Sequence, residues 1–161
     1  MLLMLVRHAD AGERDPAQWP DDTLRPLTEK GRKVHARVAK ALRDSGLIPE
    51  LVLTSPWLRA AQTAEILVHG LGVAAAVPCP PLAGDPDRAA LDAMIGPRKG
   101  KAMVALVGHS PWLEELAALL LTGTTNGILV DFPKSGVLGV EADRVSAEGG
   151  ALRFFLRPKL L

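Results

Sequence analysis

The chain has little of what would associate it with an oxidising compartment, a nucleic acid or a lipid surface. It has one cysteine, Cys79, among 161 residues, which excludes an internal disulfide. Its formal net charge is only +1, so no strong field draws it toward nucleic acid or an anionic membrane. We therefore expect neither of these as a partner.

Long apolar runs are also missing. No stretch approaches the roughly 18 apolar residues that a membrane-spanning helix needs. The apolar start, residues 1–6, is too short for the core of a signal peptide and is interrupted by Arg7. We expect a cytoplasmic protein.

The chain does contain enough apolar sequence for one core, with 48% hydrophobic residues. At this length two separate cores are disfavoured. We predict a single domain that spans residues 1–161, and a monomer.

Short apolar runs alternate with amphipathic segments along the chain. The pattern predicts strands at residues 2–6, 51–54, 74–77, 102–107, 129–132, 136–141 and 151–157. It predicts a loop at 10–27 and helices at 28–43, from 55 onward, at 86–95 and from 110 onward. Thr28 is the expected cap of the first helix. Ser55 and Ser110 are the expected caps of the helices that begin near them, because each serine precedes a proline. Such alternation is typical of a three-layer α/β/α, doubly wound fold, whose sheet is mostly parallel with an antiparallel edge added late.

Chemically capable side chains follow three of the predicted strands. Arg7 and His8 follow the first, Ser55 and Arg59 the second, and His109 the third. Ligands of open α/β sheets bind outside the carboxyl ends of the strands. We therefore expect these side chains to meet at one pocket.

The set suits transfer of a phosphoryl group to a histidine. A neutral imidazole, that of His8, is a good nucleophile near neutral pH. Arg7 and Arg59 can hold phosphoryl oxygens through two-pronged hydrogen bonds, and His109 can donate another. Ser55 can contact phosphate besides capping its helix. This chemistry requires no metal and no cofactor.

Each of these residues, taken alone, has a plainer interpretation. An Arg-His pair after a strand is usually structural, and Arg59 alone is typical of a solvated helix charge. His109 alone is compatible with a hydrogen bond to a loop. Only their joint arrangement favours catalysis.

The same segments resemble the histidine phosphatase superfamily, also called phosphoglycerate mutase-like. Arg7-His8 is similar to its nucleophile motif, residues 55–64 (SPWLRAAQTA) to its second arginine segment, and residues 108–111 (GHSP) to its second histidine segment. The resemblance implies the doubly wound α/β fold, His8 as the nucleophile, and phosphate binding by Arg7, Arg59 and His109.

Within the superfamily, the short length and residues 24–28 (LRPLT) resemble the small bacterial phosphohistidine phosphatases of the SixA type. The loop at residues 81–85 (PLAGD) is similar to theirs as well. This resemblance implies that Arg25 is a further cation of the phosphate pocket, although a loop charge is an equally good interpretation.

The chain departs from the superfamily pattern in two places. Ala9 stands where glycine is common after the Arg-His pair, which changes little if φ stays negative there. The glutamate that mutase-type members use as a general acid has no clear counterpart. Asp22 and Asp85 are the candidate proton donors, and a solvated loop carboxylate is the alternative for Asp22.

The lack of an acid favours a phosphohistidine substrate. A phosphate ester expels an alkoxide, which needs a proton, whereas phosphohistidine can expel a neutral imidazole. We therefore expect a phosphatase that acts through His8 on a phosphohistidine-bearing protein, such as a phosphotransfer domain. The alternatives are a phosphatase of small phosphate monoesters and a non-catalytic module that only binds phosphate.

Overall fold

The computed structural model describes residues 1–84, 87–98 and 101–161. Its centre is a six-stranded sheet with the order β3-β2-β4-β1-β5-β6. The strands are β1 (Leu2–Arg7), β2 (Leu51–Thr54), β3 (Val77–Pro78), β4 (Met103–Gly108), β5 (Val137–Glu141) and β6 (Ala151–Leu156). The first four strands pair in parallel, whereas β5 is antiparallel to both β1 and β6.

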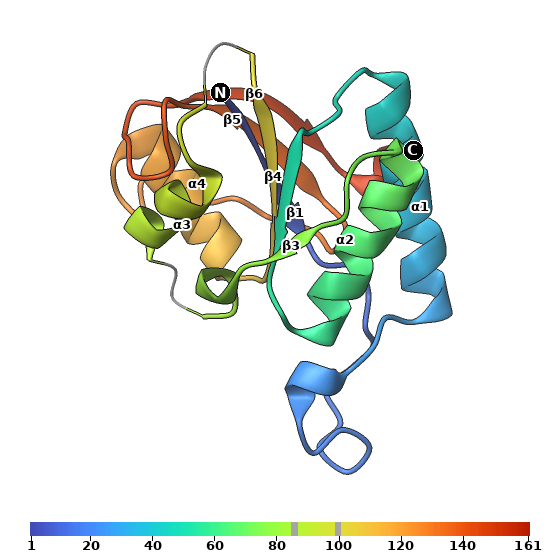
Figure 1. Cartoon of the computed structure of the whole chain (residues 1–161). Coiled ribbons are helices and arrows are strands. Elements are labelled where there is room, and N and C mark those ends of the chain that lie inside the picture. Colours follow the sequence, from blue (N-terminus) through green and yellow to red (C-terminus); the bar gives the residue numbers. More distant parts are fainter. Residues whose placement is uncertain (85–86, 99–100) are drawn as a thin grey trace.

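Helices cover both faces of the sheet (Figure 1). They are α1 (Glu29–Asp44), α2 (Leu58–Leu71), α3 (Arg88–Ile95) and α4 (Trp112–Thr122), with 3-10 turns at Asp22–Leu24, Pro80–Leu82 and Pro158–Leu160. Apolar side chains of α1 and α2 pack on one face, and those of α3 and α4 pack on the other.

Strand β1 shows why the fold has three layers. Leu3 and Leu5 belong to the core cluster under α3 and α4, while Met4 and Val6 belong to the cluster under α1 and α2. Successive side chains of a strand point to opposite faces, so an uninterrupted apolar strand needs cover on both sides. The predicted three-layer α/β/α fold with a late antiparallel edge is confirmed.

Only one of three predicted helix caps is confirmed. The Thr28 side chain accepts a hydrogen bond from the backbone N–H of Gly31 at 2.9 Å and caps α1. The prediction was wrong for Ser55 and Ser110, since α2 and α4 begin after Trp57 and Pro111. The Ser55 hydroxyl contacts His109 instead, and the Ser110 hydroxyl donates to the Glu114 carboxylate.

The predicted strand at residues 129–132 is also wrong. This segment has no regular structure, and Leu129 is 97% exposed. β5 occupies the place beside β1, and Pro133 lacks the N–H that a ladder needs. The Phe132 carbonyl instead accepts a hydrogen bond from Arg7 Nη1 at 2.5 Å.

The strand predicted at one edge of the sheet is present, but it is shifted along the chain and is shorter than expected. We predicted it at residues 74–77, and β3 lies at Val77–Pro78. Among the residues that the structure describes, no helix combines the length and the apolar character required to cross a membrane.

Candidate active site

His8, Ser55 and His109 follow the carboxyl ends of three neighbouring strands, β1, β2 and β4. The backbone N–H of His8 donates to the Gly108 carbonyl at 3.0 Å, and that of Ser55 donates to the Val107 carbonyl at 2.9 Å. These bonds extend the sheet ladders by one residue. Three side chains from distant parts of the sequence are therefore positioned by the most rigid part of the fold.

His8 is a buried, neutral imidazole with a defined tautomer. Its Nδ1 lies 2.7 Å from the Ala9 carbonyl oxygen, which can only accept, so Nδ1 carries the proton and Nε2 keeps its lone pair. Burial lowers the pKa of His8 to about 4, against the opposing effect of this hydrogen bond, and the charges of Arg59 and Arg7 lower it further. The ring is therefore in its nucleophilic form at neutral pH.

His109 lies beside His8, with ring centroids 5.2 Å apart. Its Nε2 is 2.8 Å from the Ser55 hydroxyl oxygen, which also accepts a hydrogen bond from the Trp57 N–H at 3.3 Å. Ser55 keeps its hydroxyl proton for His109 Nε2 in the tautomer that carries the ring proton on His109 Nδ1. That nitrogen is buried and has no hydrogen-bond partner within the described residues.

Burial lowers the pKa of His109 to about 3, and the neighbouring His8 and Arg59 lower it further. His109 is thus a neutral donor rather than a cation. An unpartnered buried donor is costly to leave unsatisfied, and an oxyanion above His8 would satisfy it.

Two guanidinium groups, the buried Arg59 and the partly buried Arg7, supply positive charge. Arg59 lies over the Trp57 ring, with Cζ 4.6 Å from the ring centroid, and donates to the Asp22 carbonyl at 2.8 Å. Arg7 is held by the Phe132 carbonyl. In both arginines Nε is buried and lacks a partner in the part of the chain that the structure describes. Both groups therefore keep donor capacity for an anion.

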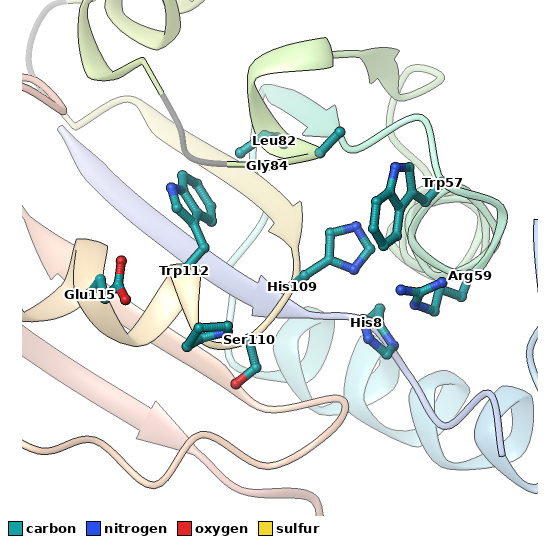
Figure 2. Close-up of a pocket in the computed structure, with 11 residues that line it drawn as sticks. His8, Trp57, Arg59, Leu82, Gly84, His109, Ser110, Trp112 and Glu115 are labelled. Atoms are coloured by element: carbon teal, nitrogen blue, oxygen red, sulfur yellow. The ribbon is translucent and has the colours of Figure 1, made fainter. Parts of the chain in front are cut away.

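His8, Arg59 and His109 border a cavity of about 260 Å³ that opens to solvent, whereas Arg7 and Ser55 are not among its lining residues. It is lined by His8, Trp57, Arg59, Leu82, Ala83, Gly84, His109, Ser110, Pro111, Trp112 and Glu115. In Figure 2, His8 and Arg59 lie together at one end, His109 lies between the two tryptophans, and Glu115 lies beyond Trp112 at the other end.

The sequence reasoning did not identify the two tryptophans or Glu115 as lining residues. A signal for the tryptophans was present, because the tripeptide Ser-Pro-Trp occurs twice, at residues 55–57 and 110–112. The first copy lies between β2 and α2, and the second lies at the junction of β4 and α4, where Trp112 is the first residue of the helix. Glu115 is exposed on the first turn of α4 and carries no comparable signal.

Arg25 is bound within its own loop. Its guanidinium donates to the Gly12 carbonyl at 2.8 Å, to the Ala11 carbonyl, and to the Asp22 carboxylate at 2.8 Å. These contacts hold together the loop that precedes α1, and Arg25 is not among the residues that line the cavity. These contacts agree with the loop-charge interpretation, and a phosphate contact by Arg25 stays a prediction.

Asp22 is a poor proton donor. The hydrogen bond from Arg25 and the charge of Arg59, whose Nη2 lies 3.3 Å from the carboxylate, hold the pKa of Asp22 below its usual range. It is ionised at neutral pH and instead orients Arg59. Asp85, the other candidate donor, lies outside the described residues.

Thr63 is a positioning residue that sequence reasoning missed. Its buried hydroxyl accepts a hydrogen bond from the Ala9 N–H at 3.0 Å and donates to the Arg59 carbonyl at 2.6 Å. The hydroxyl thereby connects the backbone that orients His8 to the helix turn that carries Arg59. Ala9 fits in place of glycine, because Ser135 is the only described non-glycine residue with a positive φ.

Within residues 1–84, 87–98 and 101–161, no group of three or more histidine, cysteine, aspartate or glutamate side chains is arranged to hold a metal ion. The arrangement as described can bind an anion through guanidinium and imidazole donors and can attack it through His8 Nε2.

Comparisons with known proteins agree with this geometry. The model of the histidine phosphatase superfamily (branch 1) matches residues 3–81. The phosphohistidine phosphatase SixA of Escherichia coli is 32% identical over 146 residues, which cover 89% of this chain and 86% of that protein. An uncharacterized protein of Picosynechococcus sp. is 37% identical over 171 residues, which cover 100% of this chain and 99% of the relative.

Solved structures show the same relationship. The protein histidine phosphatase SixA complexed with tungstate superposes with a TM-score of 0.83 at 28% identity, and 99% of each chain is covered. A putative SixA from Agrobacterium tumefaciens gives a TM-score of 0.77 at 25% identity, with coverage of 98% of this chain and 97% of that one. The chain therefore belongs to the histidine phosphatase superfamily, branch 1, and is a phosphatase of the SixA type.

Proposed function

We propose that this phosphatase removes phosphoryl groups from phosphohistidine on a protein, through a phosphohistidine intermediate on His8 and without a metal ion. The observation that carries the proposal is a neutral His8, whose Nδ1–H is held by the Ala9 carbonyl, next to the donors Arg59 and His109. The likeness to the E. coli phosphohistidine phosphatase supports the same substrate class.

In the first step, the lone pair of His8 Nε2 attacks phosphorus, and the bond between phosphorus and the substrate imidazole breaks. The electron pair of that bond returns to the substrate nitrogen. If the other ring nitrogen of the substrate carries a proton, the leaving group is a neutral imidazole and needs no further acid. Arg7, Arg59 and His109 Nδ1–H stabilise the charge on the equatorial oxygens.

In the second step, water attacks phosphorus and the bond to His8 Nε2 breaks. Phosphorylated His8 that keeps its proton on Nδ1 is a cationic ring, stabilised by the Ala9 carbonyl. It therefore leaves as neutral imidazole, while the protons of water remain on phosphate or pass to solvent. Because the same proton stays on Nδ1 in both steps, the cycle requires no carboxylic acid.

The carboxylates near the site fit this proposal. Asp22 is ionised and paired with Arg25 and Arg59. Glu115 lies at the end of the cavity away from His8 (Figure 2). When His8 attacks a phosphate monoester, the alkoxide that leaves phosphorus would have neither of these as a close proton donor, which disfavours phosphate monoesters.

Substrate preference tests the proposal directly. Turnover of a histidine-phosphorylated phosphotransfer domain and of a simple phosphate monoester should be compared at equal enzyme concentration, with and without EDTA. We expect at least a hundredfold higher kcat/KM for the phosphohistidine protein, unchanged by EDTA. A preference for the monoester would support the small-ester alternative, and binding of phosphate without turnover would support a non-catalytic module.

A further inference from the structure

Ile128, Leu129 and Val130 form an apolar run that the fold leaves outside its sheet. The sequence pattern resembles that of a buried strand, yet Leu129 is 97% exposed and Ile128 is 42% exposed. Isolated exposed apolar side chains are common on protein surfaces, but a run of them beside a hollow often marks an interaction site. Whether this run is an interaction site therefore depends on what lies beside it.

The run borders a surface hollow of about 420 Å³ lined by Pro111, Glu114, Glu115, Thr125, Asn126, Ile128, Leu129 and Val130. Pro111 and Glu115 also line the active-site cavity. The two depressions therefore share a wall at the beginning of α4. A molecule bound at His8 that extends past this wall enters the hollow.

The size of the catalytic cavity requires such an extension for a protein substrate. About 260 Å³ accommodates a phosphorylated side chain but not the domain that carries it. The surface around the substrate histidine must then rest on the rim of the cavity. Leu129 is the most exposed large apolar side chain among the described residues, and it lines the hollow next to this rim.

The charge of the hollow also restricts its partner. Among the described residues, the ionisable ones that line it are Glu114 and Glu115, and none of them is a lysine or arginine. A matching surface carries apolar side chains flanked by lysine or arginine, because opposite charges at the rim steer association.

We propose that this hollow docks the protein that bears the phosphohistidine, through an apolar patch with basic flanks next to the modified histidine. The inference rests on the proposed function and goes beyond it by naming the surface that selects a protein over a small phosphodonor. Leu129 is its central contact.

The test compares wild type with Leu129→Asp on two substrates, a histidine-phosphorylated phosphotransfer domain and phosphoramidate. Because Leu129 is exposed, its substitution should leave folding unchanged. We expect kcat/KM for the domain to fall by about tenfold or more, as for a central interface residue, and kcat/KM for phosphoramidate to stay within twofold. The matched control is Leu160→Asp, since Leu160 is 77% exposed and lies near the C-terminus, away from the cavity lining. It should change neither value.

Three results would overturn the docking proposal. They are an unchanged kcat/KM for the domain in Leu129→Asp, an equal loss on both substrates, and an equal loss in Leu160→Asp. If the wild type turns over phosphoramidate but not the phosphorylated domain, the proposed function itself fails together with the docking surface.

Discussion

The Nδ1 atom of His8 lies 2.7 Å from the carbonyl oxygen of Ala9, and this contact determines which ring nitrogen attacks phosphorus. A backbone carbonyl cannot donate, so the proton must reside on Nδ1. Nε2 is left as the nucleophile, and no carboxylate is needed to hold the ring in this tautomer.

His8 should remain neutral in mildly acidic solution. Burial lowers its pKa to about 4, so we expect a ring signal from His8 that does not titrate between pH 8 and pH 5. Histidine NMR shifts recorded against pH measure this, with His8→Gln identifying the signal. In denaturant the same ring should titrate near the ordinary value of about 6.5. A folded-state midpoint near 6.5 would show that the ring is solvated and the assignment of a buried nucleophile is wrong.

Thr63 should affect the rate of reaction rather than the binding of substrate. Its hydroxyl holds the Ala9 N–H at 3.0 Å, so Thr63→Val releases the backbone that orients His8 while keeping the side-chain volume. Small misplacements of reacting groups have large effects on rate. We expect kcat to fall by about tenfold or more, with KM within about twofold.

The matched control for this prediction is Thr63→Ser, which keeps the hydroxyl. It should restore most of the kcat lost in Thr63→Val. If both variants lose activity equally, the methyl group and not the hydrogen bond matters, and the positioning role of Thr63 fails.

His35 should make the fold sensitive to acid. It is fully buried in α1, both ring nitrogens lack partners among the described residues, and burial lowers its pKa to about 4. Because this value lies below that of the unfolded chain, the folded state binds fewer protons. Stability linked to His35 is then complete above about pH 6.5 and is lost as the pH falls toward 4.

The variant His35→Leu tests this linkage without touching the active site. The free energy of unfolding of the wild type should drop between pH 6.5 and pH 4 by about 3 kcal/mol more than that of the variant. Urea unfolding at several pH values measures the difference. Parallel pH dependences in the two proteins would contradict a neutral, buried His35.

Local sequence was sufficient to predict the layers of the fold and the positions of the two active-site histidines. An uninterrupted apolar strand such as β1 requires cover on both faces, and residues that follow parallel strands share one edge of the sheet. His8 and His109 could therefore be placed together before the structure was described.

The interpretations that failed depend on contacts between distant residues. Ser55 was expected to cap a helix, but β4 brings His109 within 2.8 Å of the same hydroxyl. The partners of Arg25, which are loop carbonyls and Asp22, also depend on how the loop folds. An apolar run such as residues 129–132 predicts a strand equally well whether or not the sheet has room beside β1, and β5 occupies that place.

The most direct test of the catalytic account is to trap the covalent intermediate. Enzyme mixed with a ³²P-labelled phosphohistidine domain should be quenched in alkaline denaturant, where phosphohistidine survives, and the labelled nitrogen identified. We predict label on His8 at Nε2 in the wild type and no label in His8→Ala. Label at Nδ1, on another residue, or undiminished in His8→Ala would contradict the account.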